Sequence, residues 1–141
     1  MSSADRAAIR DLVESYALAV DRAAAVEVAA LFVPDGDLVL FMVPPGEMQT
    51  ALRHGRAEIA TALQTLTRYR ATHHTISSFR TVVDGDRATG ETRCEAHHVD
   101  GTEDKVLYLH YLDEFARADA DWRFARREVH ARWSATVTVD G

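Results

Sequence analysis

The sequence predicts one α+β domain over residues 1–141, in which N-terminal helices pack on a single antiparallel sheet. Three observations support this fold class. Helix-period apolar patterns fill the first half of the chain, long β-rich runs fill the second, and short turn signals separate those runs. The chain has 141 residues, of which 47% are hydrophobic and 27% are charged, as expected of a globular protein with one core.

The first part of the chain predicts two helices. Serines at the N-terminus can cap the first, and apolar residues then recur at steps of three and four as far as Val20. We expect this helix to end near residue 21. A shorter helix follows in AAAVEVAALF and stops at the turn VPDGD, where Pro34 and Gly36 break the pattern.

A strand, a short extended piece and a third helix come next. The strand is expected in DLVLFMV, the extended piece in PPGEMQTALRHG and the helix in RAEIATALQTLTRYR. Four β-rich runs then complete the chain. They are THHTISSFRTVV, RATGETRCEAHHV, KVLYLHYLDEFARA and WRFARREVHARWSATV, separated by DGD, DGTED and DAD. Hairpin connections of this kind predict a strongly curved meander with helices over one face.

Charge and composition exclude several classes of function. The net charge is −6 and the basic residues are scattered, which argues against a nucleic-acid partner. No apolar run reaches the length of about 18 residues that a membrane span needs, so we expect no membrane association. The single Cys94 favours a reducing cytoplasm. No nucleotide-binding or phosphate-binding fingerprint occurs, so no cofactor is expected.

Alternation along residues 88–99 separates two faces of one strand. The odd positions carry the charged residues, whereas the even positions are small and nearly apolar, so the even face should be buried and should leave room for a pocket. His97 then lies outside and His98 inside. The predicted inner face consists of Ala88, Gly90, Thr92, Cys94, Ala96 and His98.

Hairpin pairing brings a second histidine to the same face. Folding the preceding strand back through DGD pairs residues whose numbers sum to about 170, which sets His74 beside Ala96 and near His98. On the first helix, Asp21 continues the apolar stripe and Tyr16 lies on the same side. A carboxylate there either remains solvated at the helix end or pairs with an imidazolium in the pocket.

The order of elements resembles the nuclear transport factor 2-like superfamily, and more narrowly its SnoaL-like domains. The motifs that carry the resemblance are YALAVD, LFVPDGDLVL, GRAEI and HHTISSF, and together they cover nearly the whole chain. The resemblance implies a cone-shaped α+β barrel whose curved sheet and three helices enclose a pocket. Within this group the sequence is most similar to the branch of scytalone dehydratase and bile-acid 7α-dehydratase.

That branch implies a cofactor-independent dehydratase acting on an apolar hydroxy-carbonyl compound of polyketide or steroid type. His74 would act as general base and acid, Asp21 and His98 as a coupled supporting pair, and Tyr16 as donor to the substrate oxygen. Phe41 stands where the fungal enzyme has a tyrosine. The residues expected to contact substrate are Phe41, Cys94, Thr92, Ile76 and His110.

Other functions stay open at this stage. The same fold also supports a polyketide cyclase, a ketosteroid isomerase or an epoxide hydrolase. In the epoxide hydrolase, Asp21 would act beside Arg93 or Arg80. A small-molecule binding module without turnover is the remaining alternative. Asp21 and two inward histidines could form a metal triad, but no dedicated ligand spacing occurs, so no metal is predicted. His73 and His97 are expected outside. His54, His110 and His130 are expected to be structural, with the alternative that His110 or His130, both on strands, lines the pocket.

Apolar residues on the last strands predict a homodimer through the outer sheet face, because their combined apolar area is too large to remain exposed to water on one subunit. They are Leu107, Leu109, Tyr111, Phe115, Val129 and Trp133, some of which must instead line the cavity.

Overall fold

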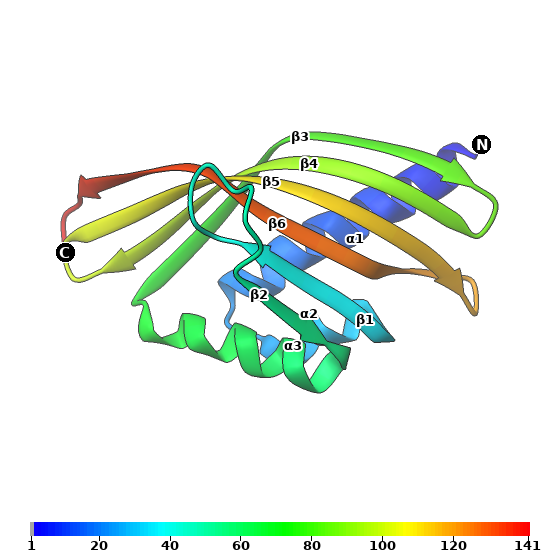
Figure 1. Ribbon diagram of the computed structural model, residues 1–141, viewed down its shortest axis with the longest axis horizontal. Helices are drawn as coiled ribbons and strands as arrows, with labels where there is room; N and C mark the ends of the chain where they lie inside the picture. Colours follow the sequence, from blue (N-terminus) through cyan, green and yellow to red (C-terminus); the bar gives the residue numbers. More distant parts are fainter. Residues whose placement is uncertain (1) are drawn as a thin grey trace.

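The computed structural model describes residues 2–141 as a six-stranded sheet with helices on one side (Figure 1). The sheet order is β2-β1-β6-β5-β4-β3, and all neighbours are antiparallel except β1 and β6. The elements are α1 (Ser3–Asp21), α2 (Ala25–Ala30), β1 (Phe32–Phe41), β2 (Ala51–His54), α3 (Gly55–Gln64), the 3₁₀ helix η1 (Thr65–Arg68), β3 (Ala71–Asp84), β4 (Arg87–Asp100), β5 (Glu103–Ala118) and β6 (Asp121–Thr138).

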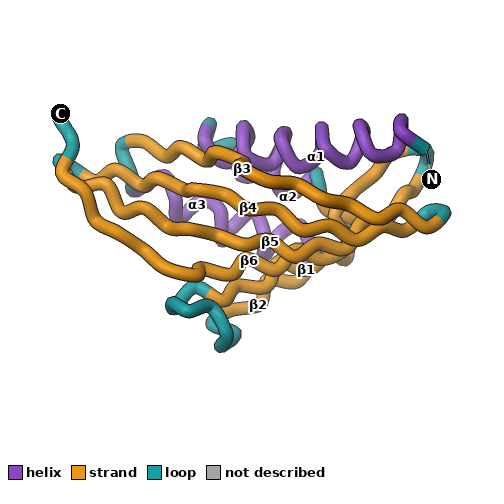
Figure 2. Tube along the Cα trace, turned by 90° about the horizontal axis from the view of Figure 1, so that it is seen from above, coloured by secondary structure: helices purple, strands orange, loops and turns teal. Residues whose placement is uncertain are grey.

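The three α-helices cover the concave side of the curved sheet, as predicted (Figures 1 and 2). The Ser2 side chain caps α1 by accepting hydrogen bonds from the amides of Ala4 and Asp5, at 3.1 and 3.4 Å. The apolar stripe of α1 is buried, and the helix runs along β3. This arrangement brings the C-terminal end of α1, and with it Asp21, to the first residues of β3.

Two predicted boundaries differ from the structure. The segment VPDGD is not a turn that precedes a strand but lies within β1, where the pairing with β6 shifts between Phe32 and Asp37. The shift accommodates Pro34 and Gly36, which have no place in a regular ladder. The third helix is α-helical only to Gln64 and continues as η1.

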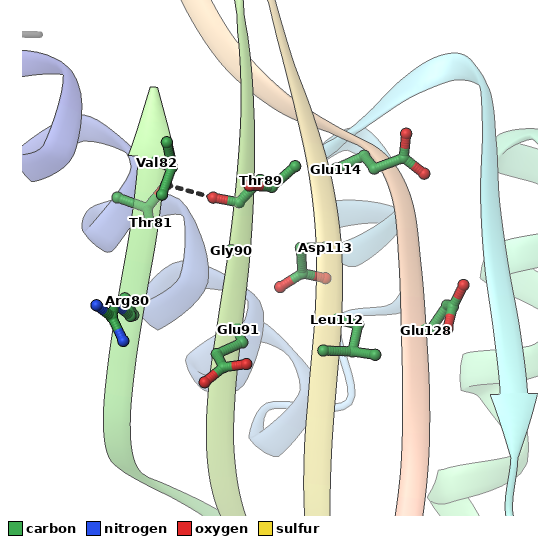
Figure 3. A pocket seen from close by; sticks show the side chains of 10 residues that line it. All are labelled: Arg80, Thr81, Val82, Thr89, Gly90, Glu91, Leu112, Asp113, Glu114 and Glu128. Carbon is green, nitrogen blue, oxygen red and sulfur yellow. Dashed lines mark hydrogen bonds between the residues drawn. The ribbon is translucent and has the colours of Figure 1, made fainter. Parts of the chain in front are cut away.

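The convex face of the sheet is more polar than the sequence predicted. A hollow of about 380 Å³ over β3–β6 is lined by Arg80, Glu91, Leu112 and Glu128, among others (Figure 3). Most of the apolar residues predicted for this face lie on the concave side, where they line the cavity or fill the core; they are Leu107, Leu109, Tyr111, Phe115 and Val129. Only Trp133 is exposed, at 58%, and its ring stacks on Tyr108 with centroids 4.9 Å apart.

Among residues 2–141 no helix is both long enough and apolar enough to cross a bilayer.

Candidate active site

A cavity of about 350 Å³ lies between the concave face of the sheet and the helices. Its walls come from α1, β1, α3, η1 and the central strands, and most of its lining side chains are aliphatic or aromatic. Four of the residues that line it carry titratable nitrogen groups, namely His74, His98, Arg68 and Lys105. An apolar hollow with a few convergent polar groups is the usual form of a small-molecule site.

Asp21 and His74 form a hydrogen-bonded dyad at one wall of this cavity. The Nδ1 atom of His74 lies 2.7 Å from Oδ1 of Asp21, and the backbone amide of His74 donates to Oδ2 at 2.8 Å. The Thr72 hydroxyl donates to Oδ1 at 3.1 Å. Both side chains of the dyad are largely buried, with 6% of His74 and 19% of Asp21 exposed. Three contacts therefore fix the carboxylate, and the carboxylate fixes the imidazole.

The dyad determines which nitrogen of His74 is available for chemistry. A carboxylate can only accept at Nδ1, so Nδ1 carries the proton and the neutral ring presents the Nε2 lone pair. Within residues 2–141 that Nε2 atom makes no hydrogen bond. An imidazole held in this tautomer by a buried carboxylate is arranged to accept a proton from a bound molecule.

His98 stands beside His74 with the same tautomer. The two rings are edge to face with centroids 5.7 Å apart, as the predicted pairing of Thr72 with His98 and His74 with Ala96 requires. Nδ1 of His98 donates to the carbonyl of Lys105 at 3.2 Å, which leaves Nε2 as an acceptor. The predicted Asp21–His98 pair is wrong, because the carboxylate reaches His74 on the adjacent edge strand instead.

The electrostatics assign different charges to these groups. Burial alone would raise the pKa of Asp21, but the hydrogen bonds and charge of His74 and the bond from Thr72 lower it below its usual value. Asp21 is therefore ionised at neutral pH. Burial lowers the pKa of His98, and the neighbouring His74 and Lys105 lower it further, so His98 is a neutral imidazole.

Tyr16 and Tyr111 form an aromatic end wall of the cavity, backed by a buried cation. The Arg127 guanidinium lies 3.7 Å from the ring centroid of Tyr111, 4.2 Å from that of Tyr16 and 4.6 Å from that of Phe124. Burial raises the pKa of both tyrosines, so both phenols stay protonated and can donate hydrogen bonds.

Arg127 pairs with Asp113, and neither side chain is exposed. The Nε atom of Arg127 donates to Oδ1 of Asp113 at 3.0 Å, whereas Nη1, Nη2 and Oδ2 have no hydrogen-bond partner among residues 2–141. Burial raises the pKa of Asp113 from 3.8 to about 6.

The five residues predicted to contact substrate do not line the cavity. Phe41 stacks on His130 with centroids 4.1 Å apart, and His110 contacts Arg132; both lie on the convex face because alternation along β1 and β5 points their neighbours inward. Thr92, Cys94 and Ile76 pack in the core. Burial raises the pKa of the Cys94 thiol to about 11, so it is a small apolar group here.

The remaining histidines bind structural partners. His97, on the convex face as predicted, bridges Asp104 at 2.5 Å and Glu95 at 2.8 Å, and its ring lies 6.3 Å from that of His73. His54 contacts Asp37, and His130 contacts the Gly46 carbonyl. In the described part of the chain no group of three potential ligands is arranged to hold a metal ion.

Three of the residues at this site were not identified from the sequence: Arg127, Arg68 and Lys105. Tyr111 was named only among the apolar residues that either face outward or line the cavity. Folding β5 back on β6 through the DAD turn pairs Tyr111 with Val129 and Asp113 with Arg127. This pairing would have indicated a buried ion pair beside the predicted donor Tyr16. Arg68 and Lys105 carried no comparable signal, because single cations on a helix end and a strand end are usually solvated.

Residues 1–128 match the SnoaL-like domain family. Among solved structures, a candidate scytalone dehydratase from Novosphingobium aromaticivorans is 26% identical, with a TM-score of 0.79 over 98% of this chain and 91% of that one. A nuclear transport factor 2-like protein with a cystatin-like fold from the same species is 25% identical, with a TM-score of 0.75 over 89% and 80% of the two chains.

A hexachlorocyclohexane dehydrochlorinase from Novosphingobium barchaimii shares the fold at 19% identity, with a TM-score of 0.80 over 95% of this chain and 90% of that one. A search of curated proteins finds no significant match. The family match spans most of the chain, and the structural matches extend over nearly all of it. The protein therefore belongs to the SnoaL-like domain family, within the nuclear transport factor 2-like fold.

Proposed function

We propose that this protein is a cofactor-independent lyase that removes water from a small hydroxy-carbonyl compound bound in the cavity. One observation carries the proposal: the Asp21–His74 dyad presents, at the wall of an apolar cavity and beside a neutral His98, an Nε2 atom that no residue of the described chain hydrogen-bonds. The likeness to a candidate scytalone dehydratase at 26% identity supports the same reaction class.

The reaction begins with removal of the proton α to the carbonyl. Nε2 of His74 takes this proton, and the electrons of the broken C–H bond form an enolate. Asp21 stabilises the imidazolium because its negative charge lies 2.7 Å from Nδ1. Tyr16, which is protonated and lines the cavity, donates a hydrogen bond to the enolate oxygen.

Loss of the hydroxyl group completes the elimination. The C–O bond at the β-carbon breaks as the enolate electrons form the new double bond, and the proton on Nε2 of His74 transfers to the departing oxygen, giving water. His74 returns to its neutral tautomer. His98 accepts a hydrogen bond from the substrate hydroxyl through its own Nε2 and orients that group toward His74.

The test is turnover of a panel of β-hydroxy ketones, followed by the absorbance of the conjugated product. Changing His74 to Ala or Asp21 to Asn should lower kcat about 10²-fold to 10⁴-fold, the usual contribution of positioned acid–base groups. His73→Ala is the matched control, because His73 is the preceding residue of the same strand and lies on the convex face. Undiminished kcat in the dyad variants would contradict the proposal, as would tight binding of compounds that are returned unchanged.

A further inference from the structure

The cavity has a charge pattern opposite to that of the whole chain. The protein carries 22 acidic and 16 basic residues, yet the only permanently charged residues that line the cavity within residues 2–141 are the cations Arg68 and Lys105. No carboxylate of that part of the chain lines the cavity, since Asp21 lies behind His74. A negative group on a bound molecule would therefore meet two cations, both on exposed side chains that line the cavity.

Neither cation is neutralised by a neighbouring acid. In the described part of the chain, Arg68 and Lys105 have no carboxylate within 4.0 Å. The exposed Asp100, at the end of β4, acts on Arg68 only through its more distant charge. Both cations are thus free to pair with a ligand.

Aromatic contacts hold Arg68 next to the histidines. Its guanidinium lies 4.8 Å from the ring centroid of Tyr69, and Nη2 donates to the Tyr69 hydroxyl at 2.7 Å. The Tyr69 ring is in turn 5.2 Å from that of His98. Lys105 also adjoins His98, because its backbone carbonyl accepts the hydrogen bond from Nδ1 of His98 and its side chain lines the cavity. The two cations come from η1 and β5, and His98 lies between them in this chain of contacts.

The rest of the cavity is apolar. Leu38, Leu40, Leu63, Leu107 and Val129 supply much of its interior surface. A ligand that fits both the aliphatic walls and the two cations has an apolar body and a negative group at one end. We propose that the cavity selects small organic carboxylates, with the carboxylate between Arg68 and Lys105 and the apolar body among the aliphatic side chains. This inference rests on the proposed function only for the reaction that follows binding. Together the two proposals identify the substrate class as a hydroxy-carbonyl compound that also carries a carboxylate.

The experiment compares the binding of 2-naphthoate and 2-naphthamide, which share an apolar body and differ in charge. Isothermal titration calorimetry measures both Kd values for the wild-type protein, for the double variant Arg68→Gln/Lys105→Gln and for the control Arg87→Gln. Arg87 is an exposed cation at the opposite end of β4. We expect the wild type and the control to bind naphthoate about tenfold more tightly than naphthamide, as a charge-assisted contact allows. The double variant should bind both compounds equally, and 0.5 M salt should weaken only the naphthoate complex.

Equal affinity of the wild type for the two compounds would overturn the inference, as would a preference for naphthoate that survives in the double variant, or absence of naphthoate binding. The His74→Ala variant separates this result from the proposed reaction. If the dyad has no catalytic role but the cations select anions, His74→Ala keeps the preference for naphthoate. If the charge selection is wrong but the dyad is catalytic, naphthoate has no advantage while the loss of turnover in His74→Ala persists.

Discussion

Replacing Asp113 with Leu leaves the Arg127 guanidinium charged and unpaired behind the aromatic wall of the cavity. Both side chains are fully buried, and Nε of Arg127 donates a hydrogen bond of 3.0 Å to Oδ1 of Asp113. Removing one partner of such a pair costs about 3–5 kcal/mol, because the remaining charge has no compensation. A domain of this size has a free energy of unfolding of about 5–15 kcal/mol, so Asp113→Leu should lose a large part of it.

The double variant Asp113→Leu/Arg127→Met should regain most of that loss. It removes Nη1, Nη2 and Oδ2, three buried polar atoms that have no hydrogen-bond partner in the described part of the chain, each of which costs about 1–3 kcal/mol. It also removes the contacts of the guanidinium with three aromatic rings, worth about 0.5–2 kcal/mol each. The two effects nearly cancel, so the double variant should lie within about 2 kcal/mol of the wild type.

Urea denaturation followed by tryptophan fluorescence measures these free energies, and the variant Asp113→Asn adds a pH test. The folded pKa of Asp113 is about 6 and the usual value is 3.8, so between these values the folded state binds more protons than the unfolded state. The stability of the wild type relative to Asp113→Asn should therefore fall by about 3 kcal/mol from pH ~4 to pH ~6 and stay constant above. A pH-independent difference, together with additive effects of Asp113→Leu and Arg127→Met, would refute this account.

Three further outcomes follow from the geometry. Tyr16→Phe should lower kcat about 100-fold with little change in KM, because it removes a donor to the enolate oxygen; an unchanged kcat would assign that role elsewhere. The hydrogen bond that His97 donates to Asp104 raises the pKa of His97 above 6.5. The stability of the wild type relative to His97→Asn should therefore be greatest below pH ~6.5 and fall as pH rises through the higher folded pKa. Thermal melts between pH ~6 and ~9 test the sign. The ring of Trp133 stacks on Tyr108 and Trp133 is 58% exposed, so this pair should lie in a homodimer interface on the convex face. The variant Trp133→Glu should then convert a dimer to a monomer, as measured by light scattering. A monomeric wild type would contradict this prediction.

Local patterns predicted the fold and the position of the two inward histidines. The periodicity of α1 was enough to bury its stripe, and alternation along β4 placed His98 inside and His97 outside. The hairpin sum of 170 gave the pairing of Thr72 with His98, because a short turn fixes the register of its two strands. These features depend on neighbouring residues in the chain.

The identity of Asp21's partner depends on long-range geometry and could not be predicted in this way. His74 and His98 share one face, and the packing of α1 along β3 brings the carboxylate to His74. β5 was ambiguous for another reason. Its central run has apolar residues on both faces, so alternation alone did not show that Leu107 and Tyr111 line the cavity.

The position of Asp21 has a consequence for the solubility of the protein. β3 is an outermost strand of the sheet, and the His74 amide that donates to Asp21 would otherwise be open to pairing with a strand of another molecule. The same carboxylate that orients the imidazole therefore shields part of an exposed strand edge. If a related protein evolved a new reaction in this cavity and lost the aspartate, another group would have to cover this strand edge. Without such a group, the exposed edge could pair with another molecule and promote aggregation.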